Sequence, residues 1–184
     1  MGCYIWKAPE QDITKVNIDG SFRSKTGKAG IGVIFRNHFG EVRNLYADEV
    51  KASSAFMAEA LAARKALDMI KLSGSGKFLI ETDCEALFKA VKCNSSDGCE
   101  WQSQIVVEDI VMSLRSASDV SFGLVYRSSN KAADWLAASS SKGVCFEGCP
   151  DQPPPSLAKL LSDDRSRCVA DVGAGFCQAR TGVG

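Results

Sequence analysis

The sequence predicts an α/β domain with a mixed five-stranded sheet and helices on both faces. Three observations support this fold class. Three short segments of alternating apolar residues come first, a long Ala-rich helical segment follows, and strands then alternate with helices. The order β-β-β-α-β-α-α-β-α combines an antiparallel start with later strands that need crossover connections and are therefore parallel.

The first three strands are expected at residues 13–19, 27–37 and 42–48. In the stretch TKVNIDGSF, Val16 and Ile18 point to one face, while Lys15, Asn17 and Asp19 point to the other. Their short, Gly-containing connections favour an antiparallel meander.

The clearest helix is expected at residues 54–72, because this segment is rich in Ala and is followed by Gly74 and Gly76. The remaining elements are a strand at 77–83, helices at 84–92 and 101–116, a strand at 119–127 and a closing helix at 130–143.

Composition divides the chain into three parts. Residues 1–12 form a lead, residues 13–143 the domain, and residues 144–184 a tail that holds four of the five prolines. We expect an extended arm and one short helical turn in the tail, and loose structure from Arg165 onward.

The net charge is zero, so no overall basic field attracts nucleic acid. No apolar run approaches the ~18 residues of a membrane span. The eight cysteines form no C-x-x-C pair, which favours free thiols in a reducing compartment. We expect an intracellular monomer, nuclear or cytoplasmic, that does not engage a membrane.

Four acidic residues have unusual positions. Glu59 lies on the helical stripe that also carries Ala63, Ala66 and Ile70, where an acid is costly unless it is paired or binds metal. A residue at the edge of the stripe that reaches water is the ordinary alternative.

The other three acids lie at ends of elements, and each alone has an ordinary explanation. Asp19 ends the first strand, Asp83 ends the fourth and precedes a helix that it could cap, and Asp134 lies in the first turn of the last helix. Together, however, four carboxylates at one place would repel one another strongly.

Divalent metal would relieve that repulsion, and Mg²⁺ prefers oxygen ligands. Two such ions ~4 Å apart can activate water and stabilise the leaving oxygen of a phosphodiester. The four acids therefore favour phosphodiester hydrolysis over sugar chemistry, which needs two carboxylates.

Five segments in this order resemble the ribonuclease H fold, and within it the plant retroelement-type domain related to reverse transcriptases. The segments are KVNIDGSF, AGIGVIFRNHFG, AEALAARKAL, IETDCEAL and YRSSNKAADWLA. The leading WKAP and the trailing PPPSLAKLLSDD also resemble flanks of that family.

The resemblance implies a ribonuclease H-like fold, two Mg²⁺ or Mn²⁺ ions, and cleavage of the RNA strand of an RNA–DNA hybrid. It implies that Asp19, Glu59, Asp83 and Asp134 are the catalytic, metal-binding acids. The predicted substrate contacts are Gly20, Ser21, Arg127 and Asn130. Gly20 would let the backbone approach the substrate, and contact with a 2′-hydroxyl would distinguish RNA from DNA.

Two departures leave an alternative open. The best-studied members have a histidine in the loop before the last helix, whereas the only histidine here is His38, and no basic handle is visible. The alternative is a non-catalytic module that binds nucleic acid or another partner, possibly a relic of a retroelement polyprotein. Trp101 and Trp135 are expected to pack rather than to stack on bases.

Overall fold

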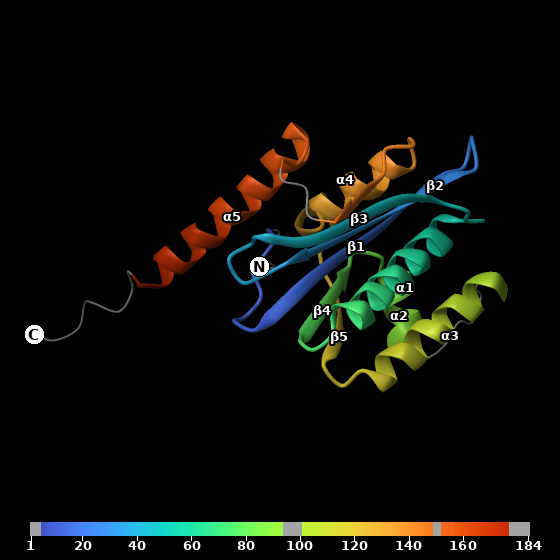
Figure 1. Cartoon of the computed structure of the whole chain (residues 1–184), viewed down its shortest axis with the longest axis horizontal. Helices are drawn as coiled ribbons and strands as arrows, with labels where there is room; N and C mark the ends of the chain where they lie inside the picture. Colours follow the sequence, from blue (N-terminus) through green and yellow to red (C-terminus); the bar gives the residue numbers. More distant parts are fainter. Residues whose placement is uncertain (1–4, 94–100, 149–151, 177–184) are drawn as a thin grey trace, which may run out of the picture.

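The computed structural model of the chain describes residues 5–93, 101–148 and 152–176. Its centre is a six-stranded sheet in the order β5-β4-β1-β2-β3-β6, with helices on both faces (Figure 1). The strands are β1 (Ile13–Arg23), β2 (Lys28–Arg36), β3 (Val42–Val50), β4 (Lys77–Thr82), β5 (Val120–Leu124) and β6 (Phe146–Gly148). The helices are α1 (Ala55–Ser73), α2 (Glu85–Cys93), α3 (Trp101–Ser116), α4 (Lys131–Ser140) and α5 (Pro155–Phe176), and the 3-10 turn η1 (Arg127–Ser129) precedes α4.

The strand pairing confirms the predicted change from antiparallel to parallel. β1, β2 and β3 form an antiparallel meander, while β4 pairs with β1, and β5 with β4, in parallel. The connections that a parallel pair requires are α1 between β3 and β4, and α2 with α3 between β4 and β5. The register places Asp19 of β1 opposite Gly32 of β2.

Two apolar clusters lie on opposite faces of the sheet. The larger cluster joins the sheet to α1, α2 and α3, and includes Val16, Ile18, Ala63, Ile80 and Ile110. The smaller cluster lies under α4 and α5, and includes Ile34, Leu45, Leu136, Leu157 and Leu161. The acid-bearing face of β1 is therefore covered by α4 rather than open to solvent.

A glycine allows α4 to approach the sheet closely. A Cβ at Gly32 would lie 2.5 Å from the carbonyl oxygen of Ala133 and 2.6 Å from the amide nitrogen of Ala137. No real Cβ tolerates such contacts with helix backbone, so Gly32 sets the distance between β2 and α4.

The sheet has one strand more than the five predicted. β6 pairs antiparallel with β3, with Phe146 opposite Ala47, and lies beyond the predicted end of the domain at residue 143. The edge of β3 has unpaired backbone N–H and C=O groups, and a following segment can form hydrogen bonds with them. A strand of three residues is too short to show an alternating apolar pattern, so the sequence did not predict β6.

The expectation of loose structure after Arg165 is also wrong as far as Phe176, because α5 spans Pro155–Phe176. Proline suits the first position of a helix. Leu157, Leu161 and Asp164, spaced four and three residues apart, are all buried. Packing of this face against the sheet supplies the stability that local sequence does not reveal.

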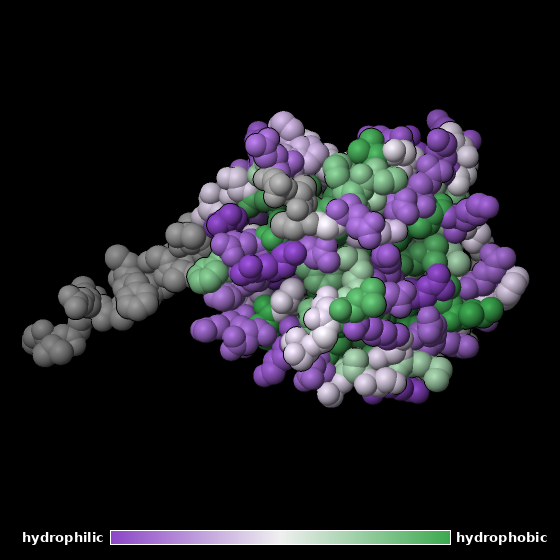
Figure 2. Space-filling model, in the orientation of Figure 1, coloured by the Kyte–Doolittle hydropathy of each residue, from purple (hydrophilic) through white to green (hydrophobic). Residues whose placement is uncertain are grey.

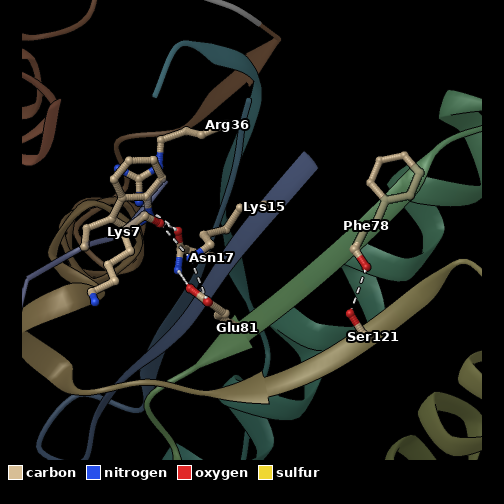
Figure 3. Close-up of polar contacts among 8 residues, drawn as sticks. Lys7, Lys15, Asn17, Arg36, Phe78, Glu81 and Ser121 are labelled. Carbon is tan, nitrogen blue, oxygen red and sulfur yellow. Dashed lines mark hydrogen bonds and ion pairs between the residues drawn. The ribbon is translucent and has the colours of Figure 1, made fainter. Parts of the chain in front are cut away.

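A buried polar network joins the N-terminal lead to the sheet (Figure 3), and Arg36 extends it to α5. Asn17 Oδ1 accepts hydrogen bonds from Trp6 Nε1 at 3.0 Å and from Arg36 Nη2 at 2.7 Å. Arg36 Nη1 contacts Asp164 Oδ2 at 2.7 Å, and the guanidinium stacks 3.8 Å from the Trp6 ring centroid. Burial raises the pKa of Asp164, and the charge of Arg36 partly opposes that rise.

The same network reaches β4. Asn17 Nδ2 donates to Glu81 Oε2 at 3.0 Å, and Lys15 Nζ contacts Glu81 Oε1 at 2.8 Å. Lys15 also donates to the carbonyl of Lys7 at 2.7 Å. The network therefore immobilises the part of β1 that leads directly to Asp19.

Figure 2 shows a mainly hydrophilic face on which hydrophobic residues form separate patches. Trp101, which was expected to pack, is 67% exposed at the start of α3, whereas Trp135 packs against Phe146 at a ring-centroid distance of 5.8 Å. Among the described residues, no helix combines the length and apolar character needed to cross a membrane.

Candidate active site

Asp19 lies within β1 rather than at its end, because the strand continues to Arg23. Only 6% of the residue is exposed. The side chain shares the face of β1 that carries Lys15 and Asn17, and the buried network holds these two neighbours. The backbone position from which the Asp19 carboxylate extends is therefore held in the centre of the sheet.

Glu59 approaches Asp19 from the other side of the sheet. Its helix, α1, begins at a Ser54 cap whose hydroxyl accepts the backbone N–H of Met57 at 3.2 Å. A Cβ at Gly20 would lie 2.3 Å from the Glu59 nitrogen, so this glycine allows α1 to touch β1. Gly20 was expected to let substrate approach the backbone. In the structure, the absence of a side chain at Gly20 lets α1 pack against β1.

Asp83 follows β4 and is held by Asn130, the residue before α4. Asn130 Nδ2 donates to Asp83 Oδ1 and to the carbonyl of Ile18, both at 2.8 Å. Thr82 Oγ1 accepts the backbone N–H of Cys84 at 3.0 Å, just before α2. The Asp83 carboxylate is thus tied to the start of α4 through Asn130, and the same amide reaches β1 at Ile18.

Asp19, Glu59 and Asp83 converge. Each offers a carboxylate oxygen, and these atoms all lie within 4.8 Å of one another. Burial raises the pKa of Asp19 to about 10, and the charges of its acidic neighbours add to the rise. Burial and the charge of Asp83 raise the pKa of Glu59 to about 8, although a hydrogen bond from the Gly20 backbone opposes this.

These three residues fit a divalent cation. Three carboxylates this close cannot all ionise at low cost unless a positive charge lies between them. One of the oxygens, Glu59 Oε2, is buried and has no hydrogen-bond partner among the described residues. Hard oxygen ligands in this arrangement suit Mg²⁺ or Mn²⁺.

Asp134 lies outside this trio. Its side chain is 43% exposed, and its Oδ1 contacts Arg127 Nη2 at 3.3 Å. It is nevertheless near enough for its charge to help raise the pKa of Asp19. The structure therefore brings together three of the four predicted acids, with the fourth beside them and engaged by an arginine.

The remaining predicted contacts have different environments. Ser21 donates to Ser141 Oγ at 3.4 Å, and the Arg127 side chain is 82% exposed. Asn130, expected at the substrate, is fully buried. Its amide holds Asp83, so its geometry is that of a positioning residue.

Sequence reasoning missed the pairing of Arg127 with Asp134 and the network around Asn17. No spacing rule signals the first, because the two residues meet only through the turn of η1. The alternation Lys15-Asn17-Asp19 was a usable signal for the second, since three polar residues on a strand covered by a helix require buried partners.

Solved structures similar to this chain include ribonucleases H1 and viral reverse transcriptases. The RNase H1 of the halophilic archaeon Halobacterium salinarum has a TM-score of 0.61 and 19% identity, with 72% of this chain and 99% of that chain covered. LC11-RNase H1, solved in complex with an RNA/DNA hybrid, has a TM-score of 0.64 and 18% identity, with 71% and 97% covered.

A foamy viral protease-reverse transcriptase, solved in complex with dsDNA, has a TM-score of 0.56 and 19% identity, with 78% of this chain and 99% of that chain covered. No curated protein sequence matches the chain. The similarities define a ribonuclease H-like fold. Residues 17–140 match the reverse transcriptase-like family, and the chain belongs to that family.

Proposed function

We propose that the protein is a metal-dependent endonuclease that hydrolyses the RNA strand of an RNA–DNA hybrid. The observation that carries this proposal is the convergence of Asp19, Glu59 and Asp83 within 4.8 Å. A partly buried cluster of acids destabilises a fold unless it has a function, such as binding cations beside a phosphodiester. The hybrid-bound relative supports the choice of substrate.

Asp19 and Asp83 would hold the first of two Mg²⁺ or Mn²⁺ ions, Glu59 would ligate near the scissile phosphate, and Asp134 would complete the second site. When bound, such ions supply Lewis-acid stabilisation of the charge that develops on the phosphate oxygens. Asn130 orients Asp83, and Gly20 and Ser21 lie beside the acids along β1, where a substrate strand would pass.

The reaction consumes one water. Its oxygen bonds to phosphorus in line with the leaving oxygen, the P–O3′ bond breaks, and one proton of the water leaves while the 3′-oxygen gains a proton. The products are a 5′-phosphate and a 3′-hydroxyl.

A gel assay on a labelled RNA–DNA hybrid tests the proposal. Cleavage is expected in Mg²⁺ or Mn²⁺, none with a chelator, and none by the Asp19→Asn variant. Metal-dependent cleavage by Asp19→Asn at the wild-type rate would exclude the assigned site.

The second candidate is a non-catalytic module that binds nucleic acid. The contact between Arg127 and Asp134 favours it, because that contact engages one of the four acids. Binding of the hybrid without cleavage in either metal would support this candidate.

A further inference from the structure

A second feature lies next to the acid cluster, on the side of α4 that faces α5. It is a pocket of about 560 Å³ lined by Arg127, Ser128, Lys131, Trp135, Ala138 and Leu160. Asp134 also lines it, so the pocket adjoins the candidate active site. Its volume is within the range of small-ligand pockets in proteins.

The lining combines three kinds of chemistry. Arg127 and Lys131 are exposed cationic side chains, suited to a phosphate; Arg127 also contacts Asp134 at 3.3 Å and would divide its donors between the two. Trp135 is half-buried, with part of its ring surface against Phe146. An aromatic ring in this situation is suited to stacking on a base.

A hydrogen-bonding group in the lining is also unused. Ser128 Oγ is buried and lacks a hydrogen-bond partner within the described part of the chain. A buried hydroxyl usually has a partner, so this one would need a side-chain rotation to meet a bound ligand. A nucleotide fits the other two features, because its phosphate suits the cations and its base suits the aromatic face.

One wall of the pocket comes from α5. Leu160 lies beyond residues 17–140, the segment that matches the family. The residues that match the family therefore do not form the whole pocket, because the C-terminal helix α5 supplies part of its lining. Asp164, one turn further along α5, anchors the helix to Arg36.

We propose that this pocket binds a nucleotide of the strand whose scissile phosphate lies at Asp19, Glu59 and Asp83. Arg127 and Lys131 contact its phosphate, Trp135 stacks on its base, and Leu160 closes the site. The inference rests on the proposed function, since it places the same nucleic acid in the molecule.

Binding measured without cleavage tests the pocket separately from the chemistry. Fluorescence anisotropy with a labelled RNA–DNA hybrid in EDTA gives the Kd for wild type, Lys131→Ala, Leu160→Glu and Trp135→Leu. Each variant is expected to raise the Kd about five-fold or more, and Lys131→Ala to lower the salt dependence by about one counterion. Leucine keeps apolar bulk against Phe146, and thermal melting checks that each variant folds.

Lys71→Ala is the matched control. Lys71 is exposed at the far end of α1, twelve residues and so about 18 Å along the helix from Glu59. Its Kd is expected to equal that of wild type.

The outcomes separate the two proposals. If Lys131→Ala and Leu160→Glu both bind within about two-fold of wild type, the pocket is not a subsite, even if wild type cleaves. If these variants bind weakly while wild type never cleaves, the pocket stands and the catalytic proposal is lost. If wild type does not bind the hybrid at all, both are overturned.

Discussion

Asn130 donates from one amide nitrogen to Asp83 Oδ1 and to the Ile18 carbonyl, both at 2.8 Å. The first bond joins the residue before α4 to the first residue after β4. The second joins it to β1, the strand that carries Asp19. A side chain outside the acid cluster thus sets the orientation of one of its members.

The Asn130→Ala variant should therefore lose both stability and metal affinity. It leaves the buried Ile18 carbonyl without this donor, at a cost of about 1–3 kcal/mol, and it frees Asp83 to rotate. Urea unfolding measures the first effect, and calorimetric titration with Mn²⁺ measures the second. Wild-type Mn²⁺ affinity in a folded Asn130→Ala protein would contradict the positioning role.

The metal-free Asp19→Asn protein should be more stable than wild type at neutral pH. Because the pKa of Asp19 is raised from 3.8 to about 10, the folded state keeps a proton that the unfolded state loses. Stability therefore decreases as pH rises between these values, with a slope of at most about 1.4 kcal/mol per pH unit for one group.

Urea unfolding in EDTA at pH 5 and pH 8 checks this prediction. The advantage of Asp19→Asn over wild type should be larger at pH 8, since asparagine has no proton to lose. A variant that is less stable than wild type at pH 8 would show that neither burial nor the neighbouring acids penalise the ionised Asp19 carboxylate.

The Asp164→Ala variant should be destabilised by about 3–5 kcal/mol, the cost of removing one partner of a buried ion pair. Arg36 keeps its bond to Asn17 but loses the 2.7 Å contact to α5. Asp163→Ala, at the exposed neighbouring position, is the control and should stay within about 0.5 kcal/mol of wild type. Equal unfolding free energies for the two variants would exclude a structural role for the pair.

The Gly32→Ala variant should displace α4 and cost about 1–3 kcal/mol through overpacking. Gly123→Ala is its control, because a Cβ there would meet only ordinary contacts, the nearest at 3.7 Å. Urea unfolding compares the two variants. Since α4 also carries Asp134, cleavage by Gly32→Ala should decrease further than its folded fraction predicts. Unchanged activity would show that the position of α4 does not affect the candidate active site.

The sequence by itself determined strands β1 to β5, helices α1 to α4 and the acids that converge at the candidate site. Alternation in β1, the Ala-rich pattern of α1 and the glycines at turns are local signals, because each depends on the period of a single element. Glu59 on an apolar stripe indicated an acid that must be paired or bind a metal, because an isolated buried charge is costly.

Tertiary structure alone decided which groups meet. Asp134 contacts Arg127 rather than joining the trio, Asn130 turns inward to Asp83, and α5 is ordered because three of its side chains are buried against the sheet. Such contacts depend on distances between elements far apart in the chain, and these distances follow from packing. No local period in a sequence encodes them.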